Sequence, residues 1–288
     1  MSFDWIPFIW EGAEIDGRYF DKVSMFLEGR LPEVGLSGRF QFDLGAPNSV
    51  LYENNVSDRL NELLARIDPQ RHIVLNGVEF PVIDSPLSVT PDVGVHGVGL
   101  LSEHGQGEED VFADGARLLG TMGADVVRGK CLIIDFPHDR LAILDETPTE
   151  YAARAVFTPL QRTPAGHVLL SLTVDGVEKR ALFDTGSSIF ELMTDKEQWQ
   201  KLTDGKVADV LEISMWGEMK AVYGGKARSD FRLGNWPLEV KMIYRVDEDD
   251  WVQFNRAHTL VGLLGNASFL GHVVILDFDS GRFGVAPE

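Results

Sequence analysis

Two aspartates occupy matching positions in the two halves of this 288-residue chain. Asp43 and Asp184 each end an apolar run and are followed by one variable residue, a glycine and a small residue, so each carboxylate stands at the start of a tight turn. An isolated turn of this kind can simply end a strand. Two carboxylates within hydrogen-bonding distance, however, cannot both ionise, and the pair shares one proton. The ionised member can then take a proton from water while the protonated member stabilises the oxygen of an attacked carbonyl.

The segment around each aspartate belongs to a longer repeat. Gly38–Ala46 matches Lys179–Ser187 at an offset of 141, and Leu118–Gly120 matches Leu263–Gly265 at an offset of 145. After each of these glycines an apolar run ends in Asp-Phe, with an arginine five residues beyond the aspartate: Asp135 and Arg140 in the first half, Asp277 and Arg282 in the second. Three matches in the same order indicate one unit written twice.

These elements resemble the acid protease family, the pepsin-like and retropepsin-like aspartic proteases. Leu182–Ser188 fits the family signature around the catalytic aspartate, both Leu-Leu-Gly elements are similar to its hydrophobic-hydrophobic-Gly motif, and Gly262–Pro287 is similar to the end of pepsin-like chains. The resemblance covers roughly residues 20–288 and implies a mostly β fold of two pseudo-twofold-related, β-barrel-like lobes with a few short helices. It implies an aspartic endopeptidase-like hydrolase that cleaves peptide bonds with a water activated between two carboxylates in the interlobe cleft. The site residues that it implies are Asp43 and Asp184 as the catalytic pair, supported by Gly45, Ala46, Thr185, Gly186 and Ser187.

The first copy departs from the family pattern at two positions. Leu44 stands where the family has Thr or Ser, whose hydroxyl makes a hydrogen bond across the lobe interface, so Thr185 lacks a symmetric partner. Ala46 removes a hydroxyl that could stabilise an ionised carboxylate, and we therefore expect the pair to act closer to neutral pH than in pepsin. The alternative function is that of a catalytically weak or inactive homologue serving as a peptide-binding or scaffold protein.

The sequence does not decide which segment would cover a bound substrate. The family places a tyrosine on a hairpin between the first aspartate and the first Leu-Leu-Gly, and no tyrosine occurs between Tyr52 and Gly120. Trp216 and Gly217 are expected to contact substrate. The candidate covering segments are 76–77, 94–107, 215–217 and 223–225.

The amino-acid composition argues against some classes of binding partner. Twenty-six Lys and Arg against 45 Asp and Glu give a formal charge of −19, which disfavours nucleic acid and anionic membranes as partners. The single cysteine, Cys131, lies in an apolar run and is expected to be a buried hydrophobe rather than a nucleophile. The spacing of His96 and His104 matches no known set of metal ligands, so no metal is expected. No organic cofactor is expected either. The N-terminal residues have no basic segment or cleavage site, and a cytoplasmic monomer acting on peptide or protein substrates is expected.

The elements that must position the aspartates are mainly short strands. Residues 168–174 and 177–183 alternate or run apolar around an Asp-Gly turn, which predicts a hairpin leading into Asp184. Ser57–Ile67 has a helical apolar face, and a second helix is expected near Thr194 with Trp199 and Leu202 inward. The run 247–250 is expected to be an exposed acidic turn. The chain is expected to divide into an N-terminal lobe, residues 1–150, and a C-terminal lobe, residues 151–288, joined within residues 145–164.

Overall fold

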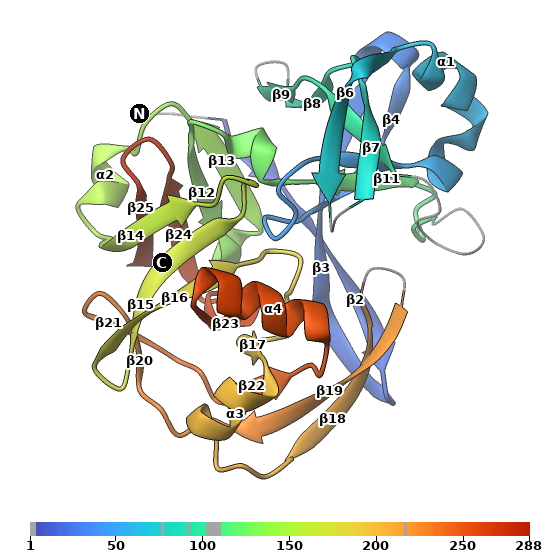
Figure 1. Cartoon of the computed structure of the whole chain (residues 1–288). Helices are drawn as coiled ribbons and strands as arrows, with labels where there is room; N and C mark the ends of the chain where they lie inside the picture. Colours follow the sequence, from blue (N-terminus) through green and yellow to red (C-terminus); the bar gives the residue numbers. More distant parts are fainter. Residues whose placement is uncertain (1–3, 76–77, 91–92, 102–110, 216–217) are drawn as a thin grey trace.

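The structure, a computed structural model, describes residues 4–75, 78–90, 93–101, 111–215 and 218–288. The chain is mostly β, with 53% strand and 17% helix, which confirms the prediction of a mostly β protein. Its described strands form two sheets, one of which curls into a half-barrel. Figure 1 shows the sheet of the first half at the upper right, the later strands below, and both chain ends at the left.

The first sheet contains strands of the first half alone, and we call it the first lobe. Its described strands are β2 (Ile9–Ile15), β3 (Arg18–Leu31), β4 (Leu36–Phe42), β5 (Val50–Tyr52), β6 (Ile67–Leu75), β7 (Val78–Ile83), β8 (Leu87–Thr90), β9 (Val93–Val95), β10 (Val98–Leu101) and β11 (Leu118–Met122). The short helices of this half are η1 (Pro32–Val34), η2 (Glu53–Arg59), α1 (Leu60–Leu64), η3 (Ala124–Val127), η4 (Phe136–His138) and α2 (Thr149–Ala152).

The second sheet takes strands from both halves. Those of the first half are β1 (Ile6–Pro7), β12 (Cys131–Asp135) and β13 (Arg140–Leu144). Those of the second half are β14 (Val156–Arg162), β15 (Val168–Val174), β16 (Val177–Phe183), β17 (Leu192–Thr194), β18 (Asp209–Met215), β19 (Glu218–Lys226), β20 (Phe231–Leu233), β21 (Trp236–Leu238), β22 (Met242–Arg245), β23 (Leu260–Leu264), β24 (His272–Asp277) and β25 (Arg282–Pro287). The helices here are α3 (Lys196–Leu202), α4 (Asp249–His258) and η5 (Asn266–Ser268). We call the part from β15 to β23 the second lobe.

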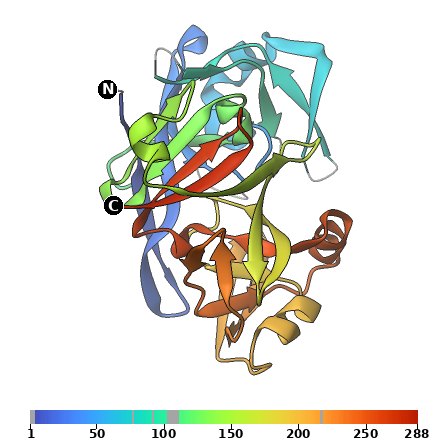
Figure 2. The same cartoon turned by 90° about the vertical axis from the view of Figure 1, so that its left-hand side faces the viewer.

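The two lobes are joined by six strands in the order β1-β13-β12-β24-β25-β14, which we call the interlobe sheet. Its centre is the antiparallel pair of β12 and β24, in which Ile133 lies opposite Ile275. Figure 2 shows β24 and β25, in red, beside β12 and β13, in green. The strand before each return turn ends in a buried aspartate that is ion-paired with the arginine of the next strand: Asp135 with Arg140 at 2.8 Å and Asp277 with Arg282 at 2.7 Å. The repeated five-residue spacing is therefore a structural device that closes each hairpin of the interlobe sheet.

The two halves repeat one pattern of strand pairing. In the first lobe β4 pairs parallel with β11, β11 antiparallel with β5, and β5 parallel with β10. In the second lobe β16 pairs parallel with β23, β23 antiparallel with β17, and β17 parallel with β22. The hairpins β6–β7 and β18–β19 occupy corresponding places beside β10 and β22. The internal repeat of the sequence is therefore a repeat of topology.

The structure corrects the register of the repeat at its second element. Phe42 pairs with Met122 and Phe183 pairs with Leu264, so Gly123 is the counterpart of Gly265. Gly123 and Gly265 also share an extended backbone, each preceding a 3-10 helix. The first-lobe counterpart of Leu263–Gly265 is thus residues 121–123, at an offset of 142, and not residues 118–120. Backbone pairing determines the register here, and the similar Leu-Leu-Gly letters three residues earlier were misleading.

The helices agree with the sequence only in part. The helix near Thr194 is α3, with Trp199 and Leu202 buried as predicted. The prediction of one helix over Ser57–Ile67 is wrong, because a 3-10 segment precedes the short α1 and β6 begins at Ile67. The acidic run at 247–250 is also not a turn, since α4 begins at Asp249. Carboxylates in the first turn of a helix are favourable because of the partial positive charge there.

Two further sequence expectations are met. The hairpin of β15 and β16 has the predicted bounds, with Val174 opposite Val177 across the Asp-Gly turn. Cys131 is buried in the interlobe sheet, and burial raises the pKa of its thiol to about 11. None of the helices in the described part of the chain has the length and apolar character needed to cross a membrane.

Candidate active site

Equivalent strand ends carry the two aspartates to the lobe junction. The Asp43 N–H, just after β4, donates to the Met122 carbonyl at 2.9 Å. The Asp184 N–H, just after β16, donates to the Leu264 carbonyl at 3.0 Å. Each aspartate is therefore fixed by the parallel strand that its own strand pairs with, which holds the loop rigidly at the edge of its lobe.

The two loops face one another, and the glycine of each loop lies against the aspartate of the other. A Cβ built on Gly45 would lie 2.6 Å from Cγ of Asp184, and a Cβ built on Gly186 would lie 2.6 Å from Cγ of Asp43. Each glycine thus makes room for the carboxyl group of the opposite lobe. The prediction that Asp43 and Asp184 meet across the lobes agrees with this geometry, and both side chains remain partly exposed while their neighbours along the chain are buried.

Backbone N–H groups hold the carboxyl groups in place. Oδ1 of Asp43 accepts from Gly45 at 2.8 Å and from Ala46 at 3.1 Å, and Oδ1 of Asp184 accepts from Gly186 at 2.8 Å. The pKa of Asp184 is raised well above its ordinary value by removal from water, by the charge of Asp43 and by a hydrogen bond with it. The two carboxyl groups therefore hold one proton between them at pH values where an isolated aspartate is ionised.

Thr185 makes the cross-lobe contact without a symmetric partner. Its Oγ1 accepts from the Leu44 N–H at 2.9 Å and donates to the Phe42 carbonyl at 2.8 Å, so one hydroxyl satisfies two buried backbone groups of the other lobe. Leu44 is fully buried in the core that both lobes share. The missing hydroxyl of the first copy is therefore replaced by apolar packing, while the bond from the second copy is retained.

The remaining predicted site residues fall into two groups. Ala46 lies in the Asp43 loop as expected, and its N–H donates to that carboxylate. The Ser187 hydroxyl contacts no polar partner among the described residues, and this residue contributes through its carbonyl, which accepts from Asn266 N–H at 2.9 Å. Trp216 and Gly217 lie outside the described residues.

The candidate covering segments are placed only in part. Residues 76–77, 216–217 and 102–107 lie outside the described residues, and Met215 is the last residue of β18. Residues 223–225 are a different case. They lie inside β19, where Gly224 packs against Tyr244 and Gly225 against Trp199, so they form part of the sheet rather than a cover.

Different polar side chains anchor the two aspartate loops. Nδ2 of Asn266 donates to the Thr185 carbonyl at 2.8 Å and to Ser188 Oγ at 2.9 Å. In the first lobe the hydroxyl of Ser49 donates to Asp125 at 2.8 Å and accepts from the Gly123 N–H at 3.1 Å. Burial raises the pKa of Asp125. Sequence reasoning missed these anchors, although Asn266 directly follows the motif glycine of the second lobe.

His167 is a second group that the sequence did not point to. It lies in the turn between β14 and β15, within electrostatic reach of Asp43, and its ring is 5.1 Å from that of Phe254 on α4. Its pKa is lowered by burial and by the charge of His258, although Asp43 opposes this. A histidine in a polar turn carries no motif, so only the fold brings it near the aspartates.

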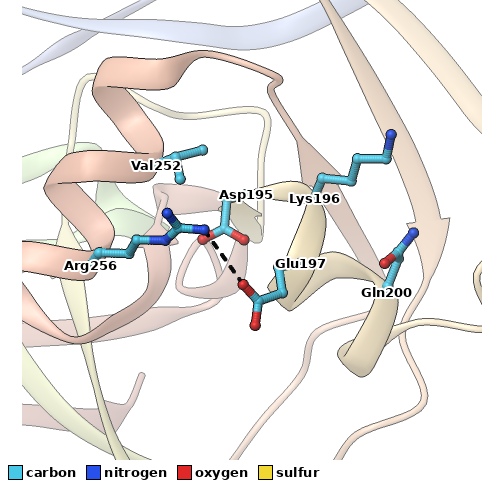
Figure 3. Close-up of a pocket in the computed structure, with 6 residues that line it drawn as sticks. All are labelled: Asp195, Lys196, Glu197, Gln200, Val252 and Arg256. Carbon is cyan, nitrogen blue, oxygen red and sulfur yellow. Dashed lines mark ion pairs between the residues drawn. The ribbon is translucent and has the colours of Figure 1, made fainter.

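Other cavities lie away from the aspartates. One of ≈ 260 Å³ opens between α3 and α4, where Arg256 is 3.7 Å from Glu197 (Figure 3). Another of ≈ 790 Å³ lies over β3 and β4 and is lined by Arg30, Arg39 and Arg117 among others. No three metal-ligating side chains gather within the described ranges.

Comparison with known proteins assigns neither a family nor a function to the chain. No model of a known protein family matches the chain, and no protein of curated function matches it.

Proposed function

We propose that this protein is an aspartic peptidase of the acid protease fold, in which Asp43 and Asp184 together activate a water molecule. The observation that carries the proposal is the packing of the two loops against each other. Each carboxyl group lies against the glycine of the other lobe. A purely structural turn has no need to bring two carboxyl groups together in a partly buried place, because their mutual repulsion costs stability.

The proposal gives the two carboxyl groups different roles. Asp184 starts with the shared proton and donates it to the carbonyl oxygen of the scissile peptide bond. Asp43 takes a proton from the attacking water, whose oxygen bonds to the carbonyl carbon. Asp43 then returns that proton to the amide nitrogen as the C–N bond breaks, giving a carboxylic acid and an amine. The proton from Asp184 returns to the pair as the carbonyl reforms, so atoms and charges balance.

Thr185 and the glycines act as positioning residues in this scheme. The two bonds of Thr185 to the Asp43 strand fix the separation of the loops, which proton transfer over hydrogen-bond distances requires. The proposed substrates are peptides or proteins, and the proposed reaction uses no metal or organic cofactor. The same proposal takes the protein to be a cytoplasmic monomer. The net charge of −19 makes nucleic acid a poor substrate.

The test is digestion of a peptide library from pH 3 to pH 8 by the wild type, Asp43→Asn and Asp184→Asn. Asp279→Asn is the matched control, because Asp279 lies in an exposed turn far along the chain from both loops. We expect cleavage by the wild type and the control only, and inhibition by a statine-type transition-state mimic. Cleavage that survives Asp184→Asn contradicts the mechanism. Absence of both cleavage and mimic binding at every pH favours the peptide-binding or scaffold alternative.

A further inference from the structure

The hairpin of β2 and β3 is much longer than its counterpart in the second half. At the offset of 141 that relates β4 to β16, His167 at the turn between β14 and β15 corresponds to Phe26 of β3. The β2–β3 hairpin instead continues to a turn at Asp16 and Gly17. We call the additional part, residues 11–24, the arm.

The arm runs past the catalytic pair toward the other lobe. Phe26 pairs with Gln41 in the β3–β4 ladder, and by the same register Ser24 is level with Asp43. The residues from Ser24 to Arg18 therefore extend about 20 Å beyond that level, at about 3.3 Å per residue. Figure 1 shows the arm leaving the first lobe and lying beside β18 and β19.

The tip of the arm is hydrogen-bonded to the second lobe. The Arg18 guanidinium donates to both carboxylate oxygens of Asp209 at 3.0 Å, and the Tyr244 hydroxyl donates to the same carboxylate at 2.7 Å. The Glu212 N–H donates to Oδ2 of Asp16 at 2.8 Å. One guanidinium nitrogen of Arg18 thus contacts both oxygens of Asp209, and together with the bond from Glu212 N–H to Asp16 it holds the tip against the second lobe.

Apolar packing seats the arm beside the Asp184 loop. Ile15 and Phe20 pack against a cluster of second-lobe residues that the arm partly covers: Phe190, Met193, Leu211, Val222, Tyr244 and Val246. The carbonyls of Phe190 and Ser187 both lie against Gly265, so Phe190 is next to the Asp184 loop. The arm therefore lies along one flank of the catalytic pair and bridges both lobes there.

A bulge gives the arm its curvature. The pairing of β2 and β3 shifts register between Glu11 and Ala13, and a Cβ built on Gly12 would meet the Tyr19 ring and the Phe20 carbonyl. An extra residue in one strand bends and twists a hairpin. Gly12 thus lets the hairpin fold over itself and curve onto the second lobe.

On the other flank the described residues show a shorter contact between the lobes, made by a turn and not by an extended hairpin. The counterpart hairpin turns back at residues 163–167, where Gly166 lies against Pro47 of the Asp43 loop. From these contacts we infer that the arm closes one end of the substrate cleft, so that the enzyme takes peptides whose scissile bond lies within a few residues of one chain end. This rests on the proposed peptidase function and names its substrate class.

The first experiment uses the unaltered protein. A cleavable core peptide is lengthened one residue at a time, on the amino side in one series and on the carboxyl side in the other. We expect kcat/KM to fall by at least about tenfold beyond the third or fourth added residue in one series only. Equal tolerance on both sides overturns the inference and leaves the peptidase function standing. Absence of cleavage of every peptide overturns both.

The second experiment releases the tip. Arg18→Glu places a carboxylate against Asp209, whereas Arg232→Glu disrupts the ion pair of an equally exposed arginine, on β20, with Asp230. We expect Arg18→Glu to cleave the peptides lengthened on the restricted side at least about fivefold faster than the wild type, and Arg232→Glu to match the wild type. Unchanged discrimination in Arg18→Glu, with the arm shown to be released by faster proteolysis at residues 11–24, overturns the inference. Folding of each variant is checked by its thermal unfolding transition.

Discussion

The carboxyl group of Asp184 lies against Gly45, two residues beyond Asp43, so closely that a methyl group there would be 2.6 Å from the carboxyl carbon. The pairing of the aspartates therefore depends on the absence of a side chain in the opposite loop, and the same holds for Asp43 and Gly186. This contact between a carboxyl group and a glycine ties the chemistry of each lobe to the backbone of the other.

Gly45→Ala is expected to separate the loops. The added methyl must displace Asp184 or its own backbone, and the overpacking costs about 1–3 kcal/mol of unfolding free energy. Peptidase activity should fall at least about 100-fold. Gly271→Ala is the matched control, because a Cβ there meets nothing within 4 Å. Peptide cleavage and denaturant unfolding measure the two effects, and full activity in Gly45→Ala would contradict the close packing of the loops.

Thr185→Val is expected to leave the Leu44 N–H and the Phe42 carbonyl without their hydrogen-bond partner. Burying such groups unsatisfied costs about 1–3 kcal/mol each, so unfolding free energy should drop by about 2–6 kcal/mol and kcat should fall with it. Thr185→Ser keeps the hydroxyl and should recover most of both. Equal losses in the two variants would mean that the methyl group, and not the hydroxyl, holds the loops.

Asp184 predicts a pH dependence of stability. Because its folded pKa is raised, its contribution to stability is complete below the ordinary aspartate pKa and is lost as pH rises through the raised value. Unfolding free energy should therefore fall as pH rises above the ordinary aspartate value of about 4, and Asp184→Asn should reduce that fall. Asp125, also raised, contributes with the same sign, so part of the fall should remain. Denaturant titrations at several pH values measure this.

Activity should follow the same proton. In the proposed mechanism cleavage requires the proton that the pair shares, so the rate should fall as pH rises through the raised pKa of Asp184. Because Ala46 offers no hydroxyl to an ionised carboxylate, we expect activity at less acidic pH than in pepsin. The check is kcat/KM against pH for one good peptide. An optimum near pH 3 with little activity from pH 4 to pH 7 would contradict the expectation.

Asp277 predicts the opposite pH dependence in the interlobe sheet. Burial opposes its ionisation, but hydrogen bonds from Arg282, Ser280 and Thr147 lower its pKa to about 2. Its contribution, about 2 kcal/mol, is present above the ordinary value near pH 4 and is lost as pH falls through about 2. Asp277→Asn should therefore destabilise the protein at pH 7 and have little effect at pH 2. A constant difference across that range would show that packing and not charge is responsible.

The sequence predicted best what short segments determine by themselves. The apolar runs and the Asp-Gly turn of the β15–β16 hairpin, and the identity of Asp43 and Asp184, follow from local patterns that long-range packing does not alter. Where similar letters recur within three residues, as at 118–120 and 121–123, only the strand pairing selects the register. The acidic start of α4 was read as a turn because charge alone does not distinguish an exposed loop from the first turn of a helix.

Residues that act through tertiary contacts were out of reach of such patterns. The Thr185 hydroxyl bonds to residues about 140 positions away in the sequence. Neither Asn266 nor His167 lies in a motif that predicts its partner. The arm is the clearest case. No motif or spacing in residues 11–24 indicates that Arg18 meets Asp209 in the other lobe.

The pairing of β12 with β24 also affects how the chain can fold during synthesis. A ribosome that has released the chain only through α2 has supplied β12, whose five residues are all buried in the final sheet, but not the strand that covers its edge. An uncovered apolar edge strand pairs readily with another chain. Until β24 emerges, nascent first halves on neighbouring ribosomes can join along Cys131–Asp135, and the strand that completes the sheet is also the one that prevents this aggregation.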